Sequence, residues 1–269
     1  GLRLFVNRKN FDAVVSTNFD QALVYSILGM IFKKNRKLHF LNEIYLHEPV
    51  ILKNKIRPFL YRHFFSNIDF MRVSSRNEIL NYSNLLKTDK NRFWYNPWPS
   101  HISAPEIITS EKGYILSAGK QYRDYSTLVK AIKGTGYKLI IVSDKYSMKN
   151  IELCDEVSVL YDIKKEEYFN LLLGSRFVIV PLSNDFCSCG QVAFLEAMSY
   201  GKPVIVTRVT GSIDYFEDGK SGILYEKGNS EDLRQKIILL NENPELRESI
   251  SREALNAVKN EFNFEKFKS

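Results

Sequence analysis

The stretch that decides the fold runs from Pro181 to Gly228 and is PLSNDFCSCGQVAFLEAMSYGKPVIVTRVTGSIDYFEDGKSGILYEKG. It follows the apolar run Phe177–Pro181, which is typical of a buried strand, and it opens with a polar loop. Helical spacing then extends over Gln191–Tyr200, and Gly201-Lys202-Pro203 ends that helix before the strand Val204–Thr207. Strand, loop, helix and strand in this order predict a βαβ unit, which binds ligands at the carboxyl ends of its strands.

The start of the helix in this unit is a candidate anion site. Free backbone N–H groups and the helix dipole favour a phosphate near Cys189, Gly190 and Gln191. Glu196 stands about two turns further along the same face, where a carboxylate accepts both hydroxyls of a ribose. The alternatives are a capping box formed by Ser188 and Gln191 without a ligand, and a solvated helix glutamate at position 196.

A second cluster follows the predicted strand Tyr114–Ala118. Gly119 permits a tight turn, and Lys120 and Arg123 place two cations at the start of the next helix. Fixed cations stabilise a departing diphosphate more in the transition state than in the ground state, which makes a metal ion unnecessary. The alternative is that both are ordinary surface cations, with Arg123 paired to Asp124.

Three stretches together carry a family resemblance. LEAMSYGKPVIVTRVTGSIDYFEDGKSGILYEKGNSEDL (residues 195–233) resembles the motif of the GT-B glycosyltransferases called glycosyl transferases group 1, close to family 4. GYILSAGKQYRDYSTLVKAI (residues 113–132) resembles the first strand, turn and helix of their C-terminal domain, and FNFEKF (residues 262–267) their terminal helix. The resemblance runs in the family's order from Gly113 to the end, and it implies two Rossmann-like domains that face a cleft.

The resemblance also implies roles for residues of the candidate site. Lys120 and Arg123 would be the catalytic residues that act on the diphosphate. The residues expected to bind the donor are Gly119, Ser188, Cys189, Gly190, Gln191 and Glu196. The family commonly carries Glu-x7-Glu, and the first glutamate, which contacts the donor sugar, is replaced by Ser188. Cys189-Gly190-Gln191 is similar to a variant turn found in some relatives, and Asp185 is a nearby carboxylate. Family 4 implies retention of the anomeric configuration, which the serine leaves open.

The remaining chain also has the pattern of an α/β protein. Strands are expected at 12–16, 37–41, 70–74, 138–143 and 157–161, with helices at 21–32, 56–65, 125–133 and 165–174. The prolines between Asn96 and Lys112 mark a linker. We therefore expect a donor-binding domain at 99–259, and an acceptor-side domain at 1–98 completed by the C-terminal helix 260–269. That domain looks short, since about two initial βα units of the family are missing from it.

Candidate acceptor contacts lie in the first domain. Asn42, Glu43 and His47 follow the strand 37–41 at the end that is expected to face the cleft. A lone histidine is more often structural, so His47 is the weakest of the three.

Charge is distributed unevenly. Residues 1–100 hold 16 Lys and Arg against 7 Asp and Glu, whereas residues 101–269 hold 22 against 24. The basic part favours contact with an anionic membrane surface, against the alternative of a solvated basic face, and no nucleic-acid motif is recognised. The apolar run Ala22–Phe32 is too short to span a bilayer, and no signal peptide is apparent. Three cysteines without a CxxC pair indicate a reduced compartment and no metal site.

Together these patterns predict a cytoplasmic glycosyltransferase, with peripheral contact on the inner face of the membrane. It would move a sugar from a nucleotide-diphosphate sugar to a glycan or lipid-linked acceptor in cell-surface polysaccharide or glycolipid synthesis, with no cofactor other than that co-substrate. Two alternatives stay open, namely a non-catalytic nucleotide-sugar-binding module or fragment, and a nucleotide-sugar epimerase of related fold. The nucleobase, sugar, acceptor and linkage are not specified by the sequence.

Overall fold

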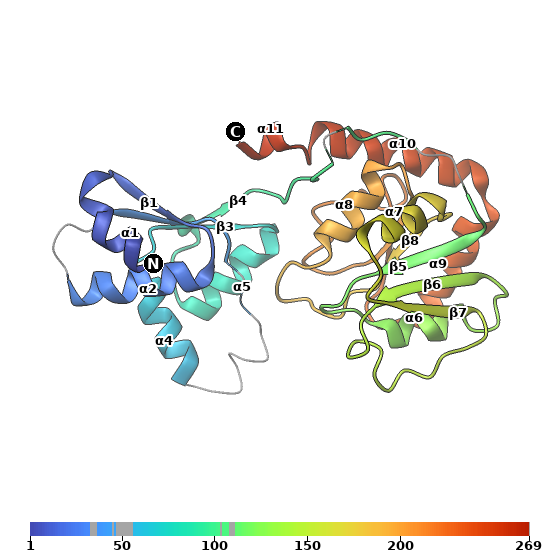
Figure 1. Ribbon diagram of the computed structural model, residues 1–269, viewed down its shortest axis with the longest axis horizontal. Coiled ribbons are helices and arrows are strands. Elements are labelled where there is room, and N and C mark those ends of the chain that lie inside the picture. The colour runs from blue at the N-terminus through green and yellow to red at the C-terminus, as the bar shows by residue number, and fades with distance from the viewer. Residues whose placement is uncertain (33–36, 45, 47–55, 103, 108–110, 269) are drawn as a thin grey trace. The chain divides into compact units, whose positions relative to one another are not determined.

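The computed structural model describes residues 1–32, 37–44, 46, 56–102, 104–107 and 111–268. The chain divides into two compact units, of which the first holds residues 1–97 with 186–188, and the second holds residues 98–185 with 189–269. Figure 1 draws the first unit mainly in blue and cyan and the second in green to red.

The first unit is built on a four-stranded parallel sheet of order β1-β2-β3-β4. Its strands are β1 (Ala13–Ser16), β2 (Leu38–Leu41), β3 (Phe70–Val73) and β4 (Phe93–Tyr95). Its helices are α1 (Leu2–Asn7), α2 (Phe19–Ile31), α4 (Ile56–Phe65) and α5 (Arg76–Leu86), with 3₁₀ turns η1 (Arg8–Asn10) and η2 (Lys90–Arg92). The expected strands and helices of this part are present within one or two residues, whereas β4 was not predicted.

A buried carboxylate organises the start of α5. Glu78 is 2% exposed and accepts hydrogen bonds from the N–H groups of Ser74 (2.9 Å) and Ser75 (3.0 Å), and from the hydroxyl of Tyr82 (3.0 Å). Burial raises the pKa of Glu78, and hydrogen bonds from Ser188, Ser74 and Tyr82 oppose that rise. Satisfying the backbone of the first turn in this way fixes where the chain leaves β3.

The second unit is built on a six-stranded parallel sheet of order β10-β9-β8-β5-β6-β7. Its strands are β5 (Tyr114–Ala118), β6 (Lys138–Ser143), β7 (Val157–Tyr161), β8 (Val178–Val180), β9 (Val204–Thr207) and β10 (Ile223–Tyr225). Its helices are α6 (Tyr125–Ile132), α7 (Lys165–Gly174), α8 (Gln191–Ser199), α9 (Ser230–Glu242), α10 (Pro244–Asn260) and α11 (Phe264–Lys268). Strands β5, β6, β7 and β9 and helix α7 have the predicted bounds.

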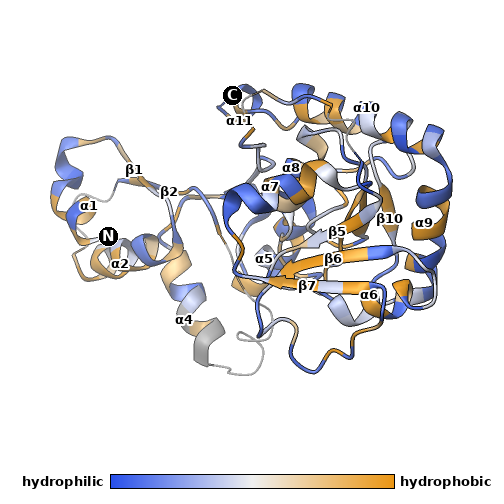
Figure 2. Cartoon of the chain, turned by 45° about the vertical axis from the view of Figure 1, so that its right-hand side comes forward, coloured by the Kyte–Doolittle hydropathy of each residue, from blue (hydrophilic) through white to orange (hydrophobic). Residues whose placement is uncertain are grey.

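The sheet of the second unit is buried on both faces, which explains its nearly continuous apolar strands. Alternate residues of a strand enter opposite layers of the core, as Ile179 does on one side and Val178 and Val180 do on the other. Figure 2 shows the hydrophobic strand β6 within this sheet. Helices α6 and α9 contribute to the Ile179 layer, and α8 and α10 to the Val178 layer.

The strand order reverses beside β5. The chain passes from β5 to β6 and β7 on one side, then returns to the other side for β8, β9 and β10. The carboxyl ends of β5 and β8 therefore flank a topological switch point, where open α/β sheets bind ligands. Both stretches that the sequence singled out follow these two strands.

The C-terminal residues group with the second unit, not with the first as the sequence led us to expect. The ring of Phe262 lies 4.9 Å from that of Tyr215, and its carbonyl accepts a hydrogen bond from the N–H of Ser100 at 2.7 Å. Phe262 is 4% exposed, so it belongs to the core of this unit. The boundary between the units falls after Pro97, one residue before the expected position.

Candidate functional site

The structure brings the two predicted loops of the second unit together. The N–H of Asp124 donates to the carbonyl of Pro181 at 3.0 Å, and the N–H of Ser183 donates to that of Tyr122 at 3.0 Å. Arg123 and Leu182 form an antiparallel bridge between them. The loops that follow β5 and β8 are thus hydrogen-bonded to each other at the switch point.

The turn at Gly119 is held on three sides. Its N–H donates to the carbonyl of Val142 at 3.0 Å, and its own carbonyl accepts from the hydroxyls of Tyr125 (2.7 Å) and Ser143 (2.8 Å). Its φ is 130°, a value that side-chain-bearing residues rarely adopt. These contacts explain why a glycine is needed directly after β5.

Arg123 is fixed by backbone carbonyls. Its Nε donates to Ala118 at 3.1 Å and its Nη1 to Gln121 at 2.9 Å. Asp124 does not take part, because its carboxylate caps α6 by accepting from the N–H (3.0 Å) and hydroxyl (2.7 Å) of Thr127. The alternative in which Arg123 pairs with Asp124 is therefore wrong, and the guanidinium stays at the end of β5.

Lys120 is held far more loosely. Its Nζ lies 3.9 Å from the carboxylate of Asp162, and its side chain is 59% exposed. An exposed ion pair of this kind contributes little free energy, so the ammonium group can turn toward a bound anion at small cost.

Helix α8 begins with a glycine in the left-handed conformation. Gly190 has φ 89° and serves as the N-cap, and a Cβ there would lie 3.0–3.3 Å from the side chains of Leu182 and Val180. The alternative of a capping box formed by Ser188 and Gln191 is wrong, because no side chain caps this helix and Nε2 of Gln191 donates to the carbonyl of Gly211 at 3.2 Å. The helix start therefore lies directly beside the loop after β8.

Glu196 lies on α8 and is half-buried. Its Oε2 accepts a hydrogen bond from the hydroxyl of Tyr168 on α7 at 3.1 Å. Burial raises the pKa of Glu196, and the hydrogen bond from Tyr168 and the charges of Lys165 and His101 oppose this rise. A carboxylate in this position accepts hydroxyl groups while most of its own solvation is already lost.

The sequence did not single out Tyr168 and Lys165 as residues of the site. Burial first, then the charge of Glu196, raises the pKa of the Tyr168 phenol far above 10, and the charge of Arg123 opposes that rise. A charge at Arg123 thus acts on a side chain that also contacts Glu196, which links the two predicted clusters. The available signal was a lysine and a tyrosine three residues apart at the start of the helix after β7.

Ser188 and Asp185 have structural partners. Ser188 groups with the first unit, where its N–H donates to Oε1 of Glu78 at 2.7 Å. In the second unit, Oδ1 of Asp185 accepts from the N–H of Thr210 at 2.9 Å.

Of the acceptor-side candidates, Asn42 and Glu43 directly follow β2 in the first unit. The carbonyl of Asn42 accepts a hydrogen bond from Nε of the buried Arg72 at 2.6 Å, and burial raises the pKa of Glu43 against the charge of Arg72. His47 lies outside the described residues. Arg72, which the sequence did not single out, is the cation next to these two candidates.

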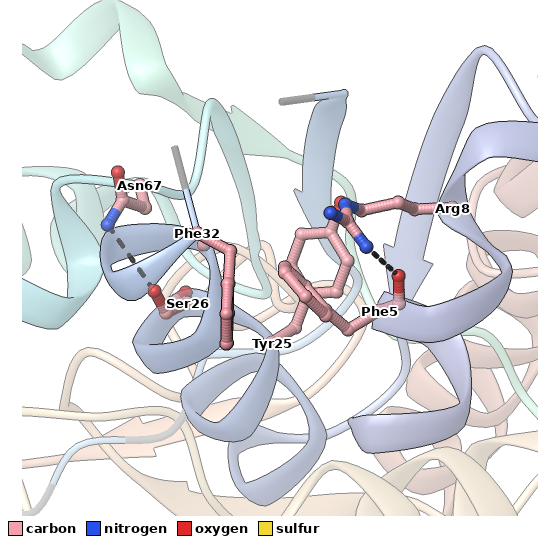
Figure 3. Close-up of a pocket in the computed structure, with 7 residues that line it drawn as sticks. Phe5, Arg8, Tyr25, Ser26, Phe32 and Asn67 are labelled. Carbon is pink, nitrogen blue, oxygen red and sulfur yellow. Dashed lines mark hydrogen bonds between the residues drawn. The ribbon is translucent and has the colours of Figure 1, made fainter. Parts of the chain in front are cut away.

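Two cavities were considered as alternatives. One of about 20 Å³ in the first unit has room for about one water molecule and is lined by Phe5, Arg8, Tyr25, Ser26, Gly29, Phe32 and Asn67 (Figure 3). One of about 380 Å³ in the second unit has carboxylates in its lining, at Asp214, Glu217, Glu253 and Glu261. The first is too small for a nucleotide, and the second has four carboxylates against one cation, Lys220, which disfavours a phosphate.

No group of three or more His, Cys, Asp and Glu side chains is arranged to hold a metal ion within the part of the chain that the structure describes. None of the helices in the described ranges combines the length and apolar character required to cross a bilayer.

Comparison with known proteins places these features in context. Residues 104–257 match the family described as glycosyl transferases group 1. An uncharacterized glycosyltransferase of Methanocaldococcus jannaschii is 27% identical over 240 residues, which are 83% of this chain and 64% of that protein. The capsular polysaccharide biosynthesis glycosyltransferase CapM of Staphylococcus aureus is 38% identical over 139 residues, which are 46% of this chain and 36% of that protein.

The aligned region thus spans less than two thirds of the length of these curated relatives. Among solved structures, HepE of Anabaena in complex with UDP is similar with a TM-score of 0.79 at 12% identity, over 99% of this chain and 79% of that one. This likeness confirms the predicted fold class, with two parallel-sheet α/β domains of the GT-B type.

Proposed function

This chain belongs to the family of glycosyl transferases group 1, and we propose that it transfers a sugar from a nucleotide-diphosphate sugar to a glycan or lipid-linked acceptor. The observation that carries the proposal is the pairing of the loops after β5 and β8 through Asp124 and Pro181. That pairing puts two cations and a helix start at one switch point of a parallel sheet.

In this proposal the donor diphosphate lies against the start of α8. Backbone N–H groups beginning at Gln191 and the helix dipole attract it, and the missing side chain of Gly119 allows Arg123 to lie over the end of β5. Lys120 and Arg123 supply the positive charge. The ribose hydroxyls donate to the carboxylate of Glu196.

The chemistry follows from where charge develops. As the bond between the anomeric carbon and the diphosphate oxygen breaks, the electron pair passes to that oxygen. An acceptor hydroxyl oxygen forms the new bond and gives its proton to the departing diphosphate. Arg123, fixed by two carbonyls, and Lys120, loosely held, stabilise the diphosphate as its charge grows. We propose further that the reaction needs no metal ion and that it retains the anomeric configuration of the sugar.

In most of the family a glutamate contacts the donor sugar. Here we assign that contact to the turn at Cys189, Gly190 and Gln191 and to Oδ2 of Asp185. Asn42, Glu43 and His47 belong to the acceptor side of the same proposal. HepE is described in complex with UDP and with UDP-glucose, so UDP is the first nucleotide to test.

We place the reaction in cell-surface polysaccharide or glycolipid synthesis at the cytoplasmic face of a membrane. CapM, to which the chain is similar, is named for capsular polysaccharide biosynthesis. The excess of cations in residues 1–100 supports peripheral contact with anionic lipid.

The deciding experiment has two steps. The purified protein is first titrated calorimetrically with UDP, GDP, ADP and CMP, and the matching sugar nucleotides are then incubated with glycan and lipid-linked acceptors. Mass increase of an acceptor by one sugar supports the proposal, and the anomeric configuration is read by NMR. Nucleotide binding without transfer identifies a binding module, and sugar conversion without an acceptor identifies an epimerase.

A further inference from the structure

We propose that Tyr168 is a positioning residue that orients the carboxylate of Glu196 for the ribose of the donor. The inference rests on the proposed function, because it concerns the same nucleotide site. Its basis is the hydrogen bond of 3.1 Å from the Tyr168 hydroxyl to Oε2 of Glu196, between helices that follow different strands.

The ring of Tyr168 is held in place by its neighbours. It packs against the buried cluster that includes Phe194 and Leu195, and its centroid lies 5.5 Å from that of Phe169. Phe169 in turn meets Tyr200 edge-on at 6.0 Å, just past the end of α8. These contacts fix α7 against α8, so the hydroxyl stands at a defined place beside Glu196.

In this arrangement the Glu196 carboxylate can accept hydrogen bonds from both Tyr168 and the donor sugar. Oε2 accepts from Tyr168, which leaves Oε1 and the second lone pair of Oε2 for sugar hydroxyls. Without the hydroxyl, the carboxylate would be free to rotate about its terminal torsion, which is broad for glutamate. Because Tyr168 already restricts this rotation in the free protein, Glu196 loses less conformational freedom when a nucleotide binds.

The hydroxyl also favours the ionised form of Glu196. The charged groups that face Glu196 are Lys165 on α7 and His101 before β5, and Arg123 acts on Tyr168 from the loop after β5. Lys165, His101 and the Tyr168 hydrogen bond oppose the effect of burial on the carboxylate. Burial raises the pKa of the Tyr168 phenol, so that the phenol is a hydrogen-bond donor at neutral pH.

The test compares two tyrosines that each donate to a glutamate. Tyr168→Phe removes the hydroxyl at the site, and Tyr137→Phe removes the hydroxyl that donates to Oε1 of Glu242 at 2.9 Å on the exposed surface of the same unit. UDP affinity is measured by calorimetry across pH for both variants and for the unchanged protein. Thermal melts of the three proteins accompany the titrations.

The expected result for Tyr168→Phe is a roughly tenfold weaker affinity near neutral pH, the size of one hydrogen bond to a charged group. The acidic midpoint of binding moves to higher pH, while Tyr137→Phe matches the unchanged protein in both measures. Unchanged affinity and midpoint in Tyr168→Phe would overturn the inference. An equal loss at every pH with a lowered melting temperature would also overturn it, since that result indicates a structural role only.

Failure of the proposed function gives a different result. If the unchanged protein binds none of UDP, GDP, ADP and CMP, the donor site itself is refuted, and the role of Tyr168 falls with it. If the unchanged protein binds and Glu196→Ala does not, the donor site stands, and only the Tyr168 comparison decides the inference.

Discussion

The guanidinium of Arg123 lies over Gly119, in the space that the Cβ of any other residue at position 119 would occupy. The glycine therefore serves two purposes, since it accepts a φ of 130° and it allows the arginine to fold back over the end of β5. The position of the cation thus depends on a residue that carries no functional group.

Replacing this glycine tests that dependence. Gly119→Ala is expected to destabilise the second unit by about 1–2 kcal/mol, because the backbone is strained and Arg123 must move. Transfer activity falls as well, because Arg123 leaves the diphosphate. Chemical denaturation and turnover measurements check the two effects.

Gly134→Ala is the matched control for that variant. Gly134 also has a positive φ, of 75°, but a Cβ there would meet no atom within 4 Å. The Gly134→Ala variant should be less stable than the unchanged protein but keep full activity per folded molecule. If the two variants lose activity equally, the placement of Arg123 by Gly119 is refuted.

The two cations should differ in how they respond to removal. Lys120→Ala is expected to lower turnover by roughly 10²-fold, as is typical when a group that stabilises transition-state charge is deleted, with the melting temperature unchanged. Arg123→Ala lowers turnover similarly and also destabilises the turn, because the carbonyls of Ala118 and Gln121 lose their donors. The control is Lys149→Ala, which removes an exposed lysine on a neighbouring loop. If Lys120→Ala and Arg123→Ala both turn over as fast as this control, the assignment is contradicted.

Glu196→Ala should weaken nucleotide binding more than it weakens folding. Removing the acceptor of the ribose hydroxyls is expected to raise the dissociation constant for UDP by about 10- to 100-fold. The control is Glu242→Ala, which removes the glutamate partner of Tyr137 on the exposed surface. Calorimetric titration of both variants decides the matter, and equal affinities would remove Glu196 from the site.

The raised pKa of Glu196 sets the pH dependence of binding. The carboxylate is the form that accepts hydroxyls, so UDP affinity falls as the pH falls through a midpoint above the ordinary value of 4.5. For stability the sign is opposite, because the folded protein binds this proton more tightly than the unfolded chain does, so that folding loses stability as the pH rises through the same window. Titrations from about pH 8 to about pH 5 should show the acidic loss in the unchanged protein.

Glu196→Gln is the control for this dependence. It should bind UDP weakly and nearly independently of pH over the same range. A persistent acidic loss in Glu196→Gln would assign the titration to another group.

The sequence predicted the elements around the site well and their partners poorly. Strand β5 and helix α7 have their expected bounds because apolar runs and helical spacing are local signals. Strand β10 was missed, since three apolar residues carry little periodicity on their own. The capping box at Ser188 matched a local pattern, but the chain turns instead at Gly190, whose left-handed backbone starts the helix.

By itself the sequence determined the parallel α/β fold and where Lys120, Arg123 and Glu196 stand in its turns and helices, because buried-strand runs, glycine turns and helix positions are set by residues close in the chain. Only the tertiary structure decided that Arg123 is fixed by carbonyls, and that Tyr168 donates to Glu196. The Arg123 contacts are close in sequence and depend on the conformation of the turn after β5, whereas the contact between Tyr168 and Glu196 joins two helices whose approach depends on the strand order of the sheet. Hydrogen bonds across that distance in sequence leave no periodic pattern, and they form only once the strands are paired.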